Sequence, residues 1–199
     1  MALNKEFKRE ILKPALILLA ITFVCTAILA VVNGFTSVVI NDNKLKSQEF
    51  SRETVLPVAE SFEPLDESPL AYVDMRYPVT QCYKGIKNGE TVGYTACVSP
   101  MGYGGSIEMV LGFDTKYNIT GIDIISMSET PGLGAKVKEP EFISGVVGKN
   151  ANIGITVVSG EIKRNNEINA VTGATISSKA VTEGVNCAVS ALKIVTKEL

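Results

Sequence analysis

The sequence predicts an α+β protein in which one N-terminal transmembrane helix precedes a single extracytoplasmic domain with an antiparallel sheet and a C-terminal helix. Three observations support this prediction: an uncharged apolar run near the N-terminus, a succession of short strand-like segments, and a clearly amphipathic stretch at the C-terminal end. The length of 199 residues allows one medium-sized domain with an appended segment, rather than two full enzyme domains.

The apolar run comes first. No charged side chain occurs from Pro14 to Asn41, and residues 14–32 are almost wholly aliphatic, which is enough helix to span the hydrocarbon core of a bilayer. We expect a transmembrane helix over residues 14–36, with Pro14 near its start, where a missing N–H is tolerated. A cleaved signal peptide ending near Ala30 is the first alternative and a buried core helix the second. The length of the run and the lack of a clear Ala-x-Ala site favour a retained anchor.

The charges that precede this run predict the orientation of the helix in the membrane. The first 13 residues hold an excess of basic over acidic side chains, namely Lys5, Lys8, Arg9 and Lys13 against Glu6 and Glu10. Because basic residues stay on the cytoplasmic side, residues 1–13 are predicted to form a cytoplasmic N-terminus. The protein would then cross the cell (inner) membrane once, with its domain outside the cytoplasm.

Composition excludes several classes of function. Histidine is absent, which removes Ser-His-Asp and Cys-His nucleophile pairs and histidine-containing metal sites. The net charge of −2 gives no electrostatic footprint for nucleic acid. The four cysteines contain no Cys-x-x-Cys pair, so no metal site is predicted, and no pair of catalytic carboxylates stands out.

The remaining elements follow in order along the chain. Residues 37–78 are predicted to be a linker with helical and loop parts, including a short amphipathic helix within 43–60 and a loop punctuated by Pro57, Pro64, Pro69 and Pro78. Residues 79–199 form the predicted domain core. Its expected elements are a hairpin (79–86 and 91–98 around a turn at 87–90), strands at 106–113 and 118–127, a short helix at 139–147, strands at 153–158 and 161–163, and a helix at 177–196.

Two cysteines lie on either side of the hairpin turn. A register that pairs Cys82 with Cys97 across the hairpin would permit a disulfide, whereas a register shifted by one residue would leave two buried thiols. Both alternatives remain open, with buried thiols favoured. Cys25 falls in the predicted anchor, and Cys187 is expected to pack in the final helix.

Three short motifs carry the functional signal. The segment Val-Thr-Gly-Ala-Thr-Ile-Ser-Ser (171–178) is a hydroxyl-rich turn leading into the last helix. One interpretation is a capping segment in which Thr175 or Ser177 accepts hydrogen bonds from first-turn N–H groups; the other is a seat for a phosphate at the helix N-terminus. The other two motifs are Ser-Glu-Thr-Pro-Gly-Leu-Gly (128–134), directly after a strand, and the loop Gly-Tyr-Gly-Gly (102–105). Each is a weak signal alone, since glycine-rich turns are common.

In this order, behind an anchor helix, the motifs closely resemble the FMN-binding domain family. Within that family the chain resembles the G subunit of the Rnf ion-translocating oxidoreductase complex, which is related to the C subunit of the sodium-pumping NADH:quinone reductase. The resemblance covers nearly the whole chain. It implies FMN held covalently as a phosphoester on Thr175, with Thr172, Gly173 and Ala174 read by a flavin transferase that uses FAD and magnesium.

The resemblance also places two loops near the flavin. Their residues are Glu129, Thr130, Gly132, Leu133 and Gly134 in one loop, and Gly102, Tyr103, Gly104 and Gly105 in the other. Tyr103 and Tyr94 are candidates for stacking on the flavin ring. The chain departs from the family pattern at Asn169, where an Asp commonly precedes the attachment residue by six positions. Asn keeps an acceptor oxygen but lacks the charge, which predicts slower flavin loading if the transferase needs a carboxylate.

The implied function is that of an electron-transfer subunit in a membrane-bound complex that couples ferredoxin oxidation and NAD reduction to sodium or proton export. Its implied partners are the other membrane and peripheral subunits of that complex and the flavin transferase, with no nucleic acid. Alternatives are a stand-alone anchored flavoprotein for extracellular electron transfer, a non-redox sensor or binding module on the same fold, and a secreted structural domain.

Overall fold

A computed structural model describes residues 5–65 and 79–197 of the chain. The predicted loop positions Pro69 and Pro78 lie outside these ranges, as do residues 1–4. The chain divides into two compact units, Met1–Lys46 and Ser47–Leu199, and each is described by itself.

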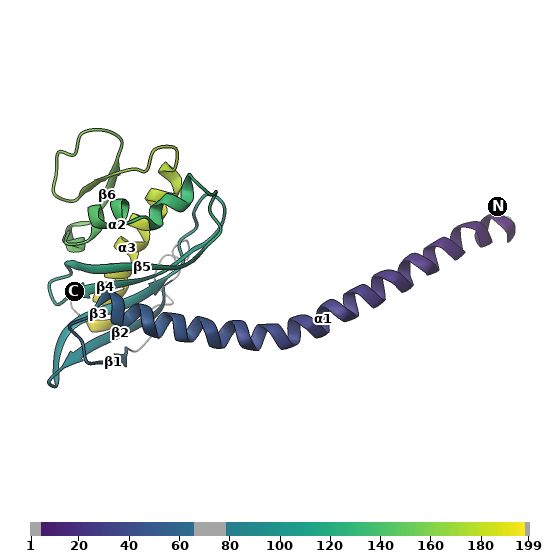
Figure 1. The fold of residues 1–199 in the computed structure, drawn as a ribbon, viewed down its shortest axis with the longest axis horizontal. Helices are drawn as coiled ribbons and strands as arrows, with labels where there is room; N and C mark the ends of the chain where they lie inside the picture. The colour runs from purple at the N-terminus through teal and green to yellow at the C-terminus, as the bar shows by residue number, and fades with distance from the viewer. Residues whose placement is uncertain (1–4, 66–78, 198–199) are drawn as a thin grey trace. The chain divides into compact units, whose positions relative to one another are not determined.

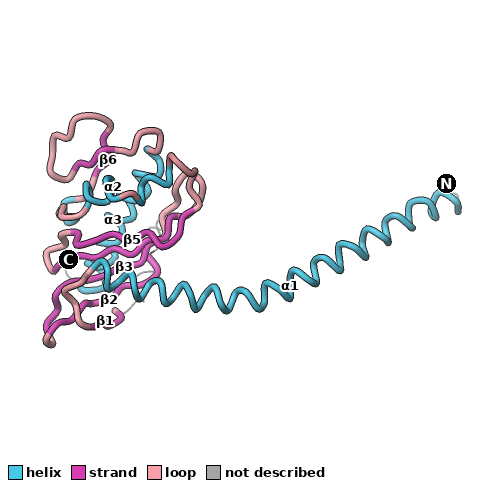
Figure 2. Tube along the Cα trace, in the orientation of Figure 1, coloured by secondary structure: helices cyan, strands magenta, loops and turns pink. Residues whose placement is uncertain are grey.

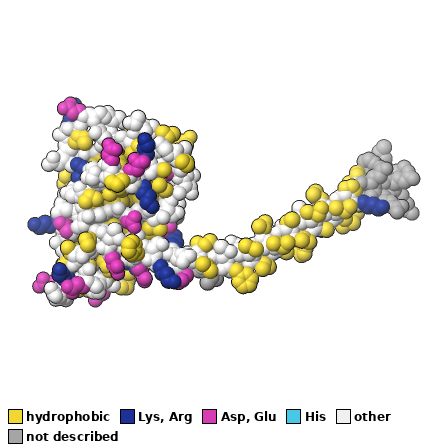
Figure 3. All heavy atoms as spheres, viewed as in Figure 1, with side chains coloured by type: hydrophobic (Ala, Val, Ile, Leu, Met, Phe, Trp, Pro, Cys, Tyr) yellow, Lys and Arg dark blue, Asp and Glu magenta, His cyan; other side chains and the backbone are white. Residues whose placement is uncertain are grey.

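Helix α1 (Lys5–Val55) runs for 51 residues without a break (Figures 1 and 2). The predicted separate helix within 43–60 is therefore the end of α1, and Pro14 lies inside the helix rather than near its start. The ring of Pro14 fits helical backbone angles but removes one N–H donor, so the helix continues through it with one hydrogen bond fewer. Within the first unit, hydrophobic side chains cover the helix from Ile11 onward (Figure 3). By length and composition α1 can cross a membrane, with a mean hydropathy of 2.9 in its most apolar window.

The second unit is built on a five-stranded antiparallel sheet. The strands are β1 (Ser61–Pro64), β2 (Val79–Lys87), β3 (Glu90–Val98), β4 (Ile107–Asp114) and β5 (Ile119–Met127). Their order in the sheet follows the chain, as Figures 1 and 2 show. The predicted hairpin and the two strands after it are confirmed. Asn88 and Gly89, both with positive φ (52° and 81°), form the tight β2–β3 turn that matches the twist of a hairpin.

Helix α3 (Thr175–Thr196) covers one face of this sheet and confirms the predicted C-terminal helix. Its apolar stripe packs against side chains from the inner face of the strands, including Met109, Leu111, Phe113 and Ile124, all of them 2% exposed or less. This cluster holds most of the buried apolar side chains of the second unit, and it packs α3 against the sheet from Ala180 onward.

The last turns of α1 cover the other face of the sheet. Two glycines allow the helix to approach the sheet this closely. A Cβ on Gly112 would overlap the carbonyl oxygen of Val55, and a Cβ on Gly121 would lie 2.8 Å from the Cα of Val55. Thr120 Oγ1 donates to Val55 O at 2.6 Å, and Ser51 Oγ donates to Asp123 Oδ2 at 2.6 Å. Together these contacts fasten the end of α1 to β4 and β5.

The sheet register decides between the two alternatives for the cysteines. Cys82 pairs with Ala96, whereas Cys97 pairs with Gln81, so the two cysteines are offset by one residue. Because side chains alternate between the faces of a strand, Cys82 points into the α3 cluster and Cys97 into the cluster that holds Val55. Both are buried thiols, and no disulfide joins them.

Smaller elements connect β5 to α3. They are η2 (Gly134–Lys138), α2 (Pro140–Val146), η3 (Ala151–Ile153), β6 (Thr156–Val158) and β7 (Glu167–Asn169), with β6 and β7 paired in parallel. The predicted helix at 139–147 is confirmed, and the strand expected at 153–158 is shortened to 156–158.

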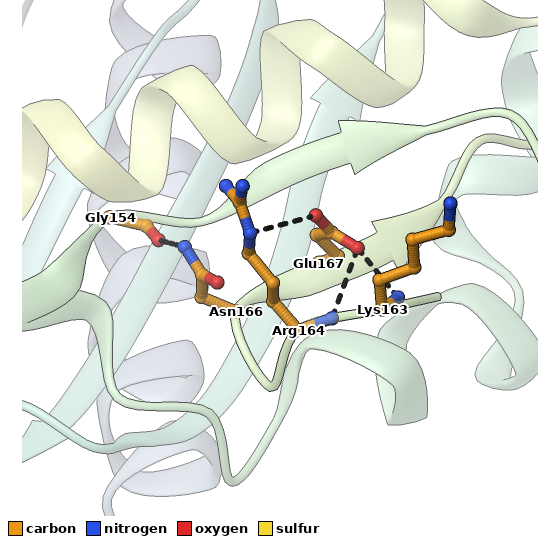
Figure 4. A network of polar contacts seen from close by, with 5 residues as sticks. All are labelled: Gly154, Lys163, Arg164, Asn166 and Glu167. Atoms are coloured by element: carbon orange, nitrogen blue, oxygen red, sulfur yellow. Dashed lines mark hydrogen bonds and ion pairs between the residues drawn. The ribbon is translucent and has the colours of Figure 1, made fainter. Parts of the chain in front are cut away.

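The strand expected at 161–163 is wrong, because those residues lie in the loop before β7. In this loop, Glu167 Oε2 accepts hydrogen bonds from the backbone N–H groups of Lys163 (2.7 Å) and Arg164 (3.1 Å), as Figure 4 shows. Those amides are satisfied by a side chain instead of a neighbouring strand. Asn166 Nδ2 also donates to Gly154 O at 2.7 Å, which ties the loop to the start of β6.

Candidate functional site

The loop at residues 102–105 lies directly against the start of the loop at 128–134. A hydrogen bond of 2.8 Å from Gly102 N to Gly105 O closes the first loop into a tight turn. A Cβ on Gly104 would overlap the carbonyl oxygen of Ser128, and one on Gly105 would lie 3.0 Å from Ser128 Cβ. Only glycine leaves room for this contact between the two loops, which accounts for Gly104 and Gly105 in the first loop.

Glu129 joins this loop to the first turn of α3. Its side chain is 8% exposed, and Oε1 accepts from the backbone N–H groups of Tyr103 (2.8 Å) and Gly104 (3.2 Å). Oε2 accepts from Ser177 Oγ at 2.8 Å. A buried carboxylate is costly unless it is hydrogen-bonded, and these three donors satisfy both of its oxygens.

The loop at 128–134 closes on itself before η2 begins. The N–H groups of Leu133 and Ala135 both donate to Thr130 O at 3.2 Å, and Gly132 takes a φ of +76° at the tip of the turn. A Cβ on Gly134 would overlap Glu129 Oε2 and would lie 2.9 Å from Ser177 Oγ. The loop therefore packs tightly against both Glu129 and the start of α3.

The turn before α3 delivers Thr175 to the surface. Gly173 has a φ of +78°, and Ala174 N donates to Val171 O at 2.9 Å, so the chain reverses just before the helix. Thr175 is the first residue of α3, and no side chain caps its first turn. The capping interpretation is thus wrong, because Ser177 gives its hydroxyl to Glu129 and Thr175 is exposed.

These segments enclose a cavity of about 420 Å³. Its lining residues are Tyr103, Glu129, Thr130, Leu133, Gly134, Gly173, Ala174, Thr175, Ile176 and Ser177. Three apolar side chains on its rim are exposed: Tyr103 (72%), Ile176 (55%) and Leu133 (47%). The N–H groups of the first turn of α3 have no carbonyl one turn earlier to receive them, so the cavity combines an apolar rim with anion-binding donors.

This donor set fits FMN. The uncapped helix start suits a phosphate, and the exposed apolar rim suits a flat aromatic ring. Within the described ranges, no group of three or more Cys, Asp or Glu side chains is close enough to hold a metal ion.

Seven residues that the sequence singled out do not line this cavity, namely Tyr94, Thr172, Asn169, Gly132, Gly102, Gly104 and Gly105. Tyr94 is buried in the core, where its ring stacks on Tyr117 at 6.1 Å between centroids, so it is not available to a flavin in the cavity. Thr172 and Asn169 are exposed and line two further cavities, of about 410 and 470 Å³, the second of which is also lined by Gly173 and Thr175. Gly132 stands at the tip of its own turn rather than in the lining.

Ile176 and Ser177 are lining residues that sequence reasoning did not assign to the site. Their proximity to the cavity follows from helix geometry, since the first turn of α3 presents residues 175–177 together. The sequence signal was the position of both residues directly after Thr175, although which of them faces Glu129 depends on the tertiary packing.

Two family models match the chain. A model described as "FMN-binding domain" matches residues 102–190, and one described as "RnfG N-terminal region" matches residues 1–51. The first range contains all three motifs, and the second contains most of α1.

Relatives with assigned functions match over nearly the full chain. The G subunit of the Na(+)-translocating ferredoxin:NAD(+) oxidoreductase complex of Acetobacterium woodii is 38% identical, over 95% of each chain. The G subunit of the ion-translocating oxidoreductase complex of Methanosarcina acetivorans is 32% identical, over 91% of this chain and 94% of its own.

Solved structures share the fold over more than three quarters of the chain. NqrC of Shewanella oneidensis superposes with a TM-score of 0.59 at 17% identity, over 77% of this chain and 98% of its own. The C subunit of the Na(+)-translocating NADH-quinone reductase of Parabacteroides distasonis gives a TM-score of 0.56 at 21% identity, over 78% and 93%. At these identities the likeness supports the fold alone.

Proposed function

The chain belongs to the family of Rnf G-type proteins with an FMN-binding domain, and from this premise we propose that it is a membrane-anchored electron carrier with FMN held as a phosphoester on Thr175. The complex to which it contributes is an ion-translocating ferredoxin:NAD oxidoreductase, as the names of its relatives indicate. Its partners are the other subunits of that complex and a flavin transferase.

The observation that carries this proposal is the placement of Thr175. Its side chain is exposed at the uncapped start of α3 and lines a cavity bounded by both glycine-containing loops. An exposed hydroxyl suits an acceptor: a transferase can join the FMN phosphate of FAD to the Thr175 oxygen, with AMP as the leaving group and the hydroxyl proton released.

Each part of the site has a role in holding the cofactor. The N–H groups of residues 175–177 bind phosphate oxygens, and Tyr103, Leu133 and Ile176 provide apolar contact for the ring. Bound FMN supplies one- and two-electron transfer, while the protein determines its position and its potential. A covalent link also prevents loss of the cofactor outside the cytoplasm, where we place the domain.

The anchor and the charges before it support that placement. Helix α1 is long and apolar enough to cross a membrane, and Lys5, Lys8, Arg9 and Lys13 precede its apolar part. Basic residues on that side favour a cytoplasmic N-terminus and an extracytoplasmic domain. Anchoring confines the domain to the membrane plane of its partners, which raises the effective concentration for electron transfer.

The test is the mass of the tryptic peptide Asn165–Lys179 after co-expression with a flavin transferase. We expect the mass of this peptide to rise by one FMN minus water on Thr175, and Thr175→Ser to keep a smaller fraction of the label. Thr175→Ala is the matched control and must abolish it. An unmodified peptide from a yellow protein would show that FMN binds without a covalent link. An unmodified peptide from a colourless protein would refute the electron-carrier proposal.

A stand-alone anchored flavoprotein would give the same peptide mass. Isolation of the native membrane fraction under mild detergent distinguishes the two, because a member of a complex is purified together with its partners and a stand-alone carrier is not. Family membership, with 95% coverage of a relative that belongs to such a complex, favours the complex.

A further inference from the structure

Glu129 connects three segments that lie far apart in the sequence. Its bonds to Tyr103 and Gly104 reach 26 and 25 residues back along the chain, and its bond to Ser177 reaches 48 residues forward. Two of these partners, Tyr103 and Ser177, line the proposed flavin cavity, and Gly104 is the chain neighbour of Tyr103. A single carboxylate therefore ties the wall that carries Tyr103 to the wall that carries Thr175.

The surroundings of Glu129 leave room for a carboxylate and little else. A Cβ on Gly102 would overlap Oε1, and a Cβ on Gly134 would overlap Oε2. Both oxygens are thus enclosed by glycines on two different loops. A side chain larger than glycine at position 102 or 134 would displace the carboxylate, so the two loops are specific for Glu129 in shape as well as in hydrogen bonding.

The charge of Glu129 matters as well as its shape. The carboxylate accepts a hydrogen bond from the first turn of α3, which is the positive end of the helix dipole and the place where we put the phosphate. Reduction adds negative charge to a flavin, and a neighbouring anion disfavours that step. A neutral residue at this position is expected to make the flavin easier to reduce.

We propose that Glu129 is a positioning residue that assembles the flavin cavity before the cofactor is attached, and whose charge lowers the potential of the attached flavin. The proposal rests on the proposed function for its second half. The first half concerns the protein without flavin: the loop at 102–105 stays in place because Glu129 holds its N–H groups.

Two substitutions separate shape from charge. Glu129→Gln keeps the size and one acceptor for Tyr103 and Gly104, while its amide can donate to Ser177 Oγ with the direction of that bond reversed. Glu129→Met keeps similar bulk and removes both acceptors. Glu167→Met is the control, since Glu167 is equally buried (9% exposed) and bonds two backbone amides, but it does not line the flavin cavity.

The first measurement is amide hydrogen exchange on the full chain without flavin. We expect exchange at Tyr103 and Gly104 to quicken about tenfold in Glu129→Met, from the loss of charge-assisted bonds, and to change little in Glu129→Gln and Glu167→Met. If Glu129→Met does not fold, Ser177→Ala serves as a second variant, because it removes only the bond from Ser177 Oγ to Glu129. Exchange at Tyr103 and Gly104 is then expected to rise moderately. Unchanged exchange in the folded variant would overturn the proposed assembly of the cavity.

The second measurement is the midpoint potential of the flavinylated protein. Glu129→Gln is expected to raise the potential relative to wild type and Glu167→Met to leave it unchanged, since only Glu129 lies at the cavity. An unchanged potential in Glu129→Gln would refute the effect of charge. A wild-type chain that takes no flavin would refute the proposed function, whereas the exchange measurement would still decide whether Glu129 holds the loop.

Discussion

Asn169 lies six residues before Thr175, at the position where the resemblance leads us to expect an Asp. It ends β7, is exposed, and lines two cavities together with other residues of the segment that precedes Thr175. We expect a transferase that approaches Thr175 along this segment to meet an amide in place of the carboxylate that the resemblance implies. The fold around the site therefore leaves room for a carboxylate at this position without any rearrangement.

We predict that Asn169→Asp is flavinylated faster than the wild-type chain. The added charge restores the group that the family commonly presents to the transferase, while the exposed position tolerates it without loss of stability. The initial rate of flavin incorporation with limiting transferase measures the effect. Asn165→Asp places the same charge in the exposed loop nearby and serves as the control; equal rates for both variants and wild type would contradict the prediction.

A second residue-scale prediction concerns pH. Burial alone would raise the pKa of Asp114, but hydrogen bonds from the side chain and N–H of Asn118 and from the N–H of Lys116 outweigh it, so the pKa lies below its ordinary value of 3.8. A depressed pKa stabilises the fold above the unfolded-state value, and this contribution is lost as the pH falls through the folded-state value. We expect the stability difference between wild type and Asp114→Asn to shrink below about pH 4, measured by urea unfolding at several pH values. A constant difference would contradict this.

At the scale of elements, the sequence predicts most of the second unit because its signals are local. The Asn88–Gly89 turn, the alternation in β3 to β5 and the stripe of α3 each depend on neighbours in the chain. The missed strands are short and depend on distant partners: β1 is defined by its pairing with β2, and β7 by its pairing with β6. The sequence predicted Glu129 near the flavin but not its hydrogen-bond partners, because these lie 25 to 48 residues away.

The contact between the end of α1 and the sheet gives a prediction for glycine. We expect Gly112→Ala to lower the free energy of unfolding by about 1–3 kcal/mol, because the added Cβ would overlap the carbonyl oxygen of Val55 and force the helix away from the sheet. Gly145→Ala is the matched control: it lies in α2 with nothing within 4 Å of the new Cβ, and it should be neutral or slightly stabilising. Thermal unfolding of both variants tests this, and equal effects would show that the close approach does not matter.

At the scale of the whole molecule, the chain offers a natural place for truncation. The second compact unit begins at Ser47, which keeps the last turns of α1 with the sheet. Val55 and Leu56 are buried there, at 1% and 0% exposed. Removal of the chain before Ser47 therefore takes away the apolar helix and keeps the packing of the domain.

We predict that residues 47–199 fold without detergent, whereas residues 57–199 are less stable by about 3–6 kcal/mol, the value of two buried aliphatic side chains. Thermal unfolding of the two truncated chains measures the difference. Residues 47–199 should also accept flavin from a transferase, since every lining residue of the cavity is retained. Equal stability of the two chains would mean that the end of α1 adds nothing to the domain.

Because Cys82 and Cys97 are offset by one residue, their thiols lie on opposite faces of the sheet, and their reactivity can report which face opens. Cys97 shares its cluster with Val55, and Cys82 belongs to the cluster that holds α3. A thiol-specific reagent should therefore label Cys97 when the end of α1 lifts from the sheet, and Cys82 only when the α3 side opens. Because Cys25 and Cys187 are free thiols as well, the labelled peptides must be identified by mass, and the labels on Cys97 and Cys82 then time the detachment of the end of α1 and the opening of the α3 side separately.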